Sequence, residues 1–246
     1  MEIVLLIALA IAPCAALVVF IYFRDKYERE PWKLLLVSFL LGVLSIAPAM
    51  VQELLFQKVP FINDHVFISA FVGVAFVEEF WKLFFLLLIP FRRKSFNEPF
   101  DGIVYAVLVS MGFATVENIL YVVQGGWGVG VLRVFTAVPA HCMFAVVMGY
   151  FVGLAKFTKG SKVGYILLGF VLAGIFHGTY DYCLFEKNYE GVWIGAFLSL
   201  IVGLILSLRA IKLHRKRSLQ LIELEQKAMQ AQANANLLEG MEPPVL

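Results

Sequence analysis

Ionisable side chains interrupt four long apolar stretches of this chain. Each stretch is otherwise apolar enough to lie in a lipid bilayer, where an ionisable group costs about 3 kcal/mol, so such a group indicates function by default. Carboxylates can act as general bases, imidazoles can transfer protons or bind a metal ion, and amides or ammonium groups can stabilise developing negative charge. The ionisable residues are Glu78, Glu79, Lys82, Glu117, His141, His177 and Asp181, and Asn118 beside them supplies an amide.

The first of these stretches carries Glu78, Glu79 and Lys82. Residues three and four apart share one face of a helix, so the lysine can contact both carboxylates. Two adjacent carboxylates in apolar surroundings do not readily ionise together, and we expect Lys82 to keep one of them charged. Either Glu78 or Glu79 is then the expected general base that activates a water molecule.

Two histidines can complete this chemistry. We expect His141 or His177 to stabilise an oxyanion or to protonate a leaving amine, assisted by Asn118. Asp181 lies four residues after His177, so its carboxylate can orient the imidazole ring. Together these groups favour hydrolysis of a peptide bond inside the membrane.

A metal-dependent alternative uses part of the same set. Two histidines, one carboxylate and a water form a common catalytic zinc set, which His141, His177 and Glu117 would supply. The chain has no HExxH motif, and these three ligands come from three different stretches. Both versions stay open, and the metal-free version is preferred.

The elements that position these residues follow from the composition. Hydrophobic residues make up 61% of the 246 positions and charged residues only 15%, whereas a soluble domain has about 45–50% apolar residues. The sequence therefore predicts an all-α, polytopic transmembrane helix bundle of about seven spanning helices, since one span needs about 20 apolar residues. The stretches are roughly 2–23, 33–56, 66–90, 101–123, 133–156, 163–185 and 190–209.

The basic residues predict how the bundle is oriented. Sixteen of the 20 lysines and arginines lie in the first, third and fifth connections or after the last span, and three lie on the other side. Because cytoplasmic segments are rich in basic residues, the N-terminus is predicted outside and the C-terminus in the cytoplasm. The expected domains are a transmembrane domain over 1–210 and a basic, amphipathic cytoplasmic tail over 211–246. The tail is expected to be helical to about residue 238 and disordered from Gly240 to Leu246.

Two local signals bear on the fourth helix. Four glycines between residues 125 and 130 predict a break after it. Asp101 is expected to cap its N-terminus.

Helix geometry places the ionisable groups at one level. At about 1.5 Å per residue, Glu79, Glu117, His141 and His177 lie roughly 15 to 24 Å from the cytoplasmic ends of their helices, in a hydrocarbon core about 30 Å thick. Four helices thus bring polar groups into one band between the midplane and the outer half. Such a band could hold water that enters from outside.

The sequence also bears on other functional classes. The chain has no basic face with stacking aromatic residues, so nucleic-acid binding is not expected. Cys14, Cys142 and Cys183 have no CxxC spacing and are expected only to pack in the core. An ion- or proton-coupled transporter remains an alternative, although no inverted repeat is visible. Two further alternatives also remain. One is a haem-binding protein that uses His141 and His177 as axial ligands, and the other is a non-enzymatic receptor or scaffold.

The order and spacing of the motifs resemble those of a known family. Glu78–Lys82 matches an EExxK pattern, Phe113–Asn118 matches FxxxEN, Pro139–His141 supplies a lone histidine, and His177–Asp181 matches HxxxD. With the stretch Glu98–Ala106, these motifs look like those of the PrsW family of intramembrane proteases, distant relatives of the CAAX prenyl endopeptidases. The resemblance covers about residues 70 to 185.

The resemblance implies a bacterial cytoplasmic-membrane protease whose substrate is a single-pass membrane protein. The expected substrate is an anti-sigma factor, cut first near its outer end, so that a stress-response sigma factor is released after a second intramembrane cut. The CAAX branch has an arginine after its glutamate pair and a histidine at the end of its second motif, where this chain has Lys82 and Glu117-Asn118. This difference leaves the base and any metal ligands unassigned.

Overall fold

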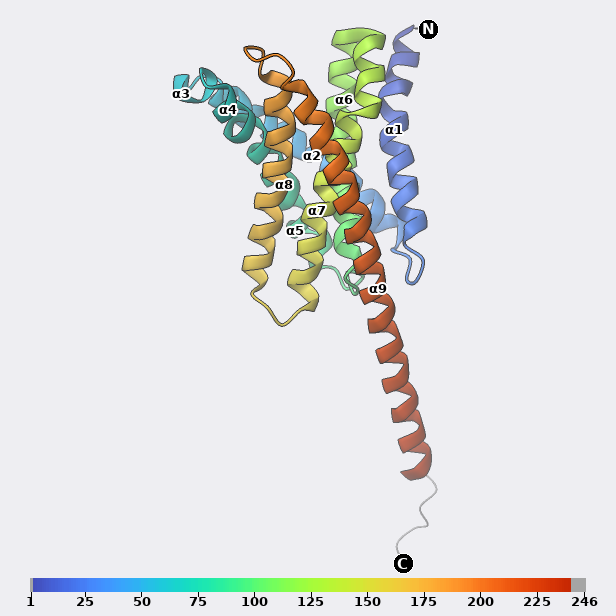
Figure 1. Ribbon diagram of the computed structural model, residues 1–246. Coiled ribbons are helices and arrows are strands. Elements are labelled where there is room, and N and C mark those ends of the chain that lie inside the picture. The colour runs from blue at the N-terminus through green and yellow to red at the C-terminus, as the bar shows by residue number, and fades with distance from the viewer. Residues whose placement is uncertain (1, 240–246) are drawn as a thin grey trace, which may run out of the picture.

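Helices follow one another along the chain in the computed structural model, which describes residues 2–239 (Figure 1). Within this range no strand occurs. The elements are α1 (Glu2–Arg24), α2 (Trp32–Phe56), α3 (Pro60–Asn63), α4 (Val66–Ile68), the π-helix η1 (Ser69–Ala75), α5 (Phe76–Leu88), the 3-10 helix η2 (Pro90–Arg92), α6 (Asp101–Phe135), α7 (Ala137–Phe157), α8 (Lys162–Phe185) and α9 (Trp193–Glu239). The predicted disorder of Gly240–Leu246 lies outside the described residues.

The predicted all-α membrane bundle is confirmed. Five stretches of the described chain are long and apolar enough to cross a membrane, and one of them, Asp101–Phe157, contains both α6 and α7. The third predicted span corresponds to three consecutive helical elements over 66–88, namely α4, η1 and α5, which are not among these five stretches. Many large apolar side chains of α1, α2, α8 and α9 are exposed, as expected for helices whose outer faces contact lipid chains.

Helix α6 is the centre of the bundle. It packs against α1, α2, α5 and α7, and every residue from 101 to 115 is buried. Glycines permit close contact with two of these neighbours. A Cβ on Gly112 would overlap the backbone of Phe39 in α2, and a Cβ on Gly149 of α7 would overlap the backbone of Gly102. Direct backbone packing therefore fixes the position of the helix that carries the second motif.

A sharp reversal divides α6. Gly126 has φ +71° and ψ −161°, a conformation that is inexpensive only for glycine, so the predicted break is confirmed. Helix resumes directly after the break and continues to Phe135. Arg133 contacts Glu117, although a straight helix would separate residues 16 positions apart by about 24 Å. The second part of α6 therefore folds back along the first (Figure 1).

The third predicted span is not one regular α-helix. The sequence predicts a single span over 66–90, whereas residues 69–75 form a π-helix that leads directly into α5. Phe71 and Phe76, five residues apart, pack where α8 has glycines: a Cβ on Gly178 or Gly174 would overlap their rings. The wider π-helical turn brings side chains five apart onto one side, and such turns are frequent at functional sites.

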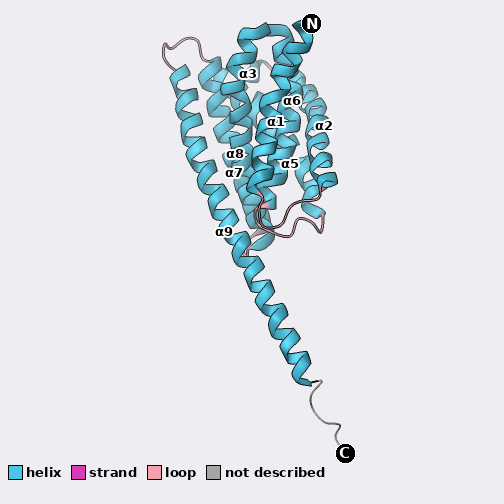
Figure 2. Cartoon of the chain, turned by 90° about the vertical axis from the view of Figure 1, so that its right-hand side faces the viewer, coloured by secondary structure: helices cyan, strands magenta, loops and turns pink. Residues whose placement is uncertain are grey.

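Helix α9 continues without a break through residue 210, where the predicted transmembrane domain ends. His214 Nδ1 donates to the carbonyl of Pro99 at 2.6 Å, and Ser218 Oγ accepts from the backbone N–H of Phe100 at 3.2 Å. The turns just beyond residue 210 thus hold the segment that leads into α6, and the rest of α9 extends away from the bundle (Figure 2). The division of the chain into two domains stays a prediction.

Asp101 does not cap α6, so that prediction is wrong. Its Oδ2 accepts instead from the backbone N–H groups of Asn97 and Glu98, each at 2.8 Å. The carboxylate points back toward the preceding loop, because that loop has donors that no helix satisfies.

Further buried carboxyl groups surround the same loop. Asp25, Glu30 and Glu98 are each 5% exposed or less, and Tyr105 donates a hydrogen bond to Glu30. Burial raises the pKa of Asp25 to about 6, that of Glu30 to about 7 and that of Glu98 to about 8. The repulsion from the carboxylate of Asp25 adds to the rise at Glu98.

These carboxyl groups should make the stability of the fold depend on pH. An unfolded carboxyl group loses its proton near pH 4, whereas Asp25, Glu30 and Glu98 keep theirs up to about pH 6, 7 and 8. Ionisation therefore lowers the free energy of the unfolded state more than that of the folded state. The stability present at acidic pH is lost as the pH rises from about 4 through 8. We expect Glu98→Gln to flatten this loss and to raise the unfolding temperature at alkaline pH by a few degrees.

Thermal unfolding of the purified protein across this pH range measures the effect. Glu223→Gln, at an exposed position of α9, is the matched control and should keep the wild-type slope. An unchanged slope in Glu98→Gln would mean that Glu98 does not titrate in this range.

Candidate active site

The eight residues predicted from the sequence come together between four helices. They lie on α5 (Glu78, Glu79, Lys82), α6 (Glu117, Asn118), α7 (His141) and α8 (His177, Asp181). Helix α7 begins only at Ala137, after the folded-back part of α6. His141 therefore lies deep in the bundle although it is near the start of its helix.

A buried ammonium holds the α5 side of the cluster together. Lys82 Nζ lies 2.8 Å from Glu79 Oε1 and 3.0 Å from Glu78 Oε2. It also lies 3.2 Å from Nδ1 of His141 and faces the ring of Phe113. A buried charge is tolerated only when it is paired. The predicted contact of Lys82 with both glutamates is confirmed, and it extends to the imidazole on α7.

His177 is fixed by carboxylates on two sides. Its Nδ1 lies 3.0 Å from Glu79 Oε1, and its Nε2 lies 3.3 Å from Asp181 Oδ2. Its ring stacks on Phe144 with centroids 4.8 Å apart. Asp181 is thus placed where it can orient the ring. The rings of His177 and His141 meet edge to face with centroids 5.2 Å apart, which leaves no space between them for a porphyrin.

Arg133 is a member of the cluster that the sequence does not predict. Its guanidinium donates to Glu117 Oε2 at 2.8 Å and to Asn118 Oδ1 at 2.7 Å. The same oxygen of Glu117 lies 2.8 Å from Nε2 of His141. The sequence places Arg133 among the outer basic residues, because only the reversal at Gly126 reveals its return. The available signal was a single charged residue between apolar neighbours.

Asn118 faces α1 and Arg133 in this arrangement. Its Nδ2 donates to the carbonyl of Ala10 at 2.8 Å, and its Oδ1 accepts from Arg133. Both ends of the fully buried amide are therefore engaged. Asn118 ties α1 to the cluster and positions the guanidinium.

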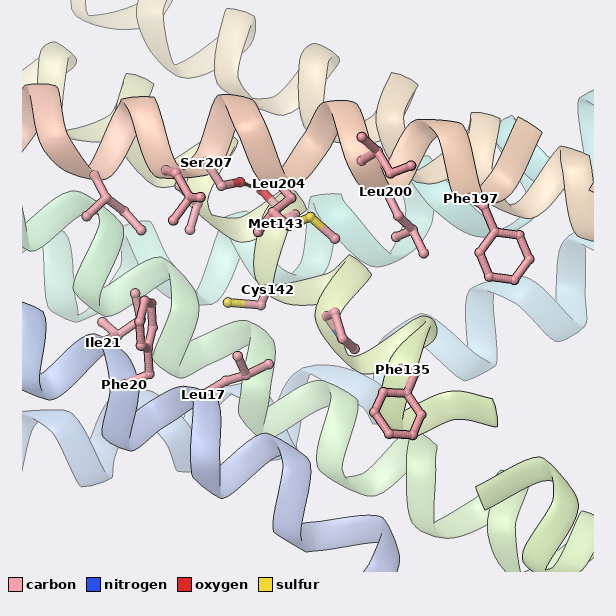
Figure 3. Close-up of a pocket in the computed structure, with 15 residues that line it drawn as sticks. Leu17, Phe20, Ile21, Phe135, Cys142, Met143, Phe197, Leu200, Leu204 and Ser207 are labelled. Carbon is pink, nitrogen blue, oxygen red and sulfur yellow. Dashed lines mark hydrogen bonds between the residues drawn. The ribbon is translucent and has the colours of Figure 1, made fainter. Parts of the chain in front are cut away.

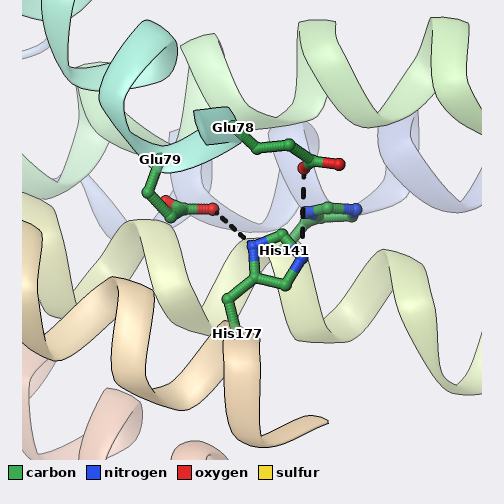
Figure 4. A group of neighbouring side chains, drawn as sticks. All are labelled: Glu78, Glu79, His141 and His177. Atoms are coloured by element: carbon green, nitrogen blue, oxygen red, sulfur yellow. Dashed lines mark hydrogen bonds and ion pairs between the residues drawn. The ribbon is translucent and has the colours of Figure 1, made fainter. Parts of the chain in front are cut away.

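Four of these residues could hold a metal ion. One nitrogen or oxygen atom from each of Glu78, Glu79, His141 and His177 lies within 4.8 Å of the others (Figure 4). Among the described residues, Glu79 Oε2 is a buried atom without a hydrogen-bond partner. Two imidazoles and two carboxylates are a donor set that suits zinc, so the residues present fit such an ion. Glu117, part of the predicted zinc set, is not among the four. It contacts the far nitrogen of His141, as carboxylates that orient metal-binding imidazoles do.

The cluster opens into a cavity of about 780 Å³. Glu78, Glu117, His141, His177 and Asp181 line it, whereas Glu79 and Lys82 lie behind this lining. The rest of the wall comes mainly from α2, η1, α6, α7 and α8. The cavity is large enough for water and an extended peptide segment to reach the ionisable groups.

A second cavity has a different character. It measures about 430 Å³ and lies between α1, α7 and α9 (Figure 3). Its walls are aliphatic and aromatic apart from Cys142 and Ser207. With no acid, base or metal-binding pair in its lining, it offers no chemistry comparable to that of the ionisable cluster.

Comparisons with known proteins agree with this geometry. The profile of the PrsW family of intramembrane metalloproteases matches residues 30–209. The chain is 37% identical over 193 residues to Protease PrsW of Geobacillus kaustophilus, which covers 78% of this chain and 85% of that protein. It is 36% identical over 180 residues to Protease PrsW of Bacillus subtilis, which covers 73% of this chain and 82% of that protein. This chain belongs to the PrsW family.

Membership of the PrsW family confirms the resemblance inferred from the motifs and makes the chain a multi-pass cell-membrane protein of a protease family. The matched range contains the whole ionisable cluster, Arg133 included. No solved structure shows a significant match.

The contacts of Arg133 predict a role in positioning His141. Arg133→Gln removes the charge that faces Glu117 and leaves that carboxylate with the imidazole alone. Loss of a group that supports a site residue typically lowers activity about 10–100-fold, and we expect a loss of this size. The measurement is the rate of cleavage of single-pass membrane substrates by the protein reconstituted in vesicles.

Arg92→Gln, at an exposed position in η2, is the control and should retain full activity. Equal rates for Arg133→Gln and wild type would exclude this role of the guanidinium.

Proposed function

We propose that this chain hydrolyses a peptide bond of single-pass membrane proteins inside the bilayer. The observation that carries the proposal is the buried group of Glu78, Glu79, His141 and His177, in which one polar atom of each converges within 4.8 Å. Three of them, all except Glu79, line a large cavity. Acids, bases and charge-stabilising groups for amide hydrolysis thus meet at one place that water can fill.

The roles of the two glutamates differ because only one of them faces the cavity. Glu78 lines it, so we assign Glu78 the general-base role toward a water molecule in the cavity. Glu79 lies behind, where Oε1 contacts both Lys82 and His177. It therefore holds the ammonium and the imidazole in place, and Lys82 balances the charge of the pair.

The two imidazoles take the remaining roles. His177 donates Nδ1–H to Glu79, which leaves Nε2 beside Asp181 to deliver a proton to the leaving amine. His141, held by Glu117 on one side and Lys82 on the other, is placed to stabilise the negative charge that develops on the carbonyl oxygen.

The roles above describe the site without a metal ion. Zinc is the proposed cofactor, and Glu78, Glu79, His141 and His177 are the residues that would hold it. The convergence of one nitrogen or oxygen atom from each of these four residues within 4.8 Å supports this assignment. Bound there, zinc would act as a Lewis acid and make a water molecule easier to deprotonate. Glu117 would orient His141 from behind.

We propose that the substrate is a membrane-anchored anti-sigma factor, as the family resemblance implies, and that this enzyme makes the first cut near the outer end of its single helix. The proposed orientation, with the N-terminus outside, is supported by the distribution of basic residues. It places the cavity in the outer half of the bilayer.

Cleavage of a panel of single-pass membrane substrates in reconstituted vesicles tests this function. Wild type should cut at least one of them, and Glu78→Gln should lower the rate by about 10²–10⁴-fold, as expected for loss of acid–base catalysis. Glu79→Gln should lower it by a similar factor, because Lys82 and His177 lose the carboxylate that holds them. Glu223→Gln is the exposed control, and unfolding temperatures check that the variants are folded.

The same cleavage assay with a chelator tests whether the activity depends on zinc. We expect chelation to abolish cleavage and added zinc to restore it. Full activity after exhaustive chelation would contradict the zinc proposal, and equal cutting by wild type and both glutamate variants would contradict the catalytic assignment.

A further inference from the structure

Helix α2 carries a carboxylate into the wall of the catalytic cavity. Trp81 Nε1 of α5 donates to Gln52 Oε1 of α2 at 2.9 Å, which fixes the rotation of α2 beside the Glu–Lys cluster. The next residue, Glu53, then lines the same cavity as Glu78 and His177. It is half-buried, among apolar residues of α2 and α6 such as Met50 and Phe113.

Glu53 differs from every other carboxylate at this site. Glu78 and Glu79 contact Lys82, and the carboxylates on α6 and α8 contact Arg133, His141 or His177. Among the residues that the structure describes, none forms a hydrogen bond or an ion pair with the side chain of Glu53.

The charge balance of the site is negative as a result. Five carboxylates (Glu53, Glu78, Glu79, Glu117 and Asp181) meet two permanent cations, Lys82 and Arg133, and the two imidazoles add at most two positive charges. With all five carboxyl groups ionised, at least one negative charge is uncompensated. A divalent cation held by neutral imidazoles supplies the same two positive charges as two protonated imidazoles. The excess negative charge therefore does not depend on whether a metal ion is bound.

We propose that Glu53 is a specificity-determining residue that binds a lysine or arginine side chain of the substrate close to the cut bond. The inference rests on the proposed peptidase function and deepens it. A half-buried carboxylate with apolar neighbours attracts a cation more strongly than an exposed one, because water screens the pair less. An acidic substrate side chain would instead meet an uncompensated negative charge, and a neutral one would leave the carboxylate without a partner.

Binding to an inactive chain separates this inference from catalysis. The full-length Glu79→Gln variant, reconstituted in vesicles, is titrated with fluorescent single-pass peptides that wild type cuts. If wild type cuts none, peptides that bind this variant with measurable affinity are used instead. Each peptide is compared in forms that carry lysine, glutamine or glutamate at successive positions across the outer end of its helix.

We expect at least one position at which lysine binds about tenfold more tightly than glutamine. Adding Glu53→Gln should abolish this preference, and adding Glu53→Lys should transfer it to the glutamate form. Adding Glu190→Gln, at an exposed position of the α8–α9 connection outside the cavity, should leave the preference unchanged.

A lysine preference that persists in Glu53→Gln, or no preference at any position, would overturn the role of Glu53. Cleavage of the same peptides by wild type is a separate readout. Absence of cleavage together with a Glu53-dependent preference would refute the peptidase function and leave the binding assignment standing.

Discussion

The ammonium of Lys82 lies inside the bundle, and the rest of the site is arranged around the need to pair it. A charge removed from water is stable only next to opposite charge or good acceptors. Here two carboxylates of its own helix and an imidazole of α7 fulfil that need. The carboxylates in turn contact His177 on α8. One buried cation therefore fixes the relative positions of three helices, and the groups that neutralise it are the groups that hydrolysis requires.

The helices around this cluster are shaped to deliver side chains to it. The reversal at Gly126 returns Arg133 to Glu117, so that a second cation supports the carboxylate behind His141. Phe71 of the π-helix and Phe76 at the start of α5 pack against the glycines of α8 and thus set where Glu78 and Glu79 emerge. Interior polar contacts of this kind are costly unless every member is satisfied, which explains why distant segments converge on one site.

The membrane helices and the pairs of site residues within one helix can be predicted from the sequence. Helix periodicity pairs Lys82 with Glu78 and Glu79, and the same rule pairs His177 with Asp181, because these partners lie within one turn of each other. Bilayer thickness then brings the four motifs to a similar level. The membrane helices themselves follow from apolar length alone.

Other features depend on tertiary contacts that spacing does not encode. Arg133 is assigned to the outer side by its position in the sequence, and only the backbone conformation of Gly126 brings it back. Asp101 looks like a helix cap, but the backbone donors of the Asn97–Glu98 loop capture it. Glu53 lies in an ordinary apolar span, and its access to the cavity depends on the contact between Gln52 and Trp81.

The central claim is that the buried charges around Lys82 perform chemistry and do not merely hold helices together. The most direct test is the cleavage rate of the double variant Glu79→Gln/Lys82→Met in vesicles, compared with wild type and with Lys82→Met alone. Removing both members of a buried pair is often tolerated, whereas removing one leaves an unpaired charge and costs about 3–5 kcal/mol. The double variant should therefore unfold at a temperature closer to that of wild type than Lys82→Met does, and yet it should cleave nothing. Cleavage by the double variant at the wild-type rate would contradict the account and reduce the cluster to a structural element.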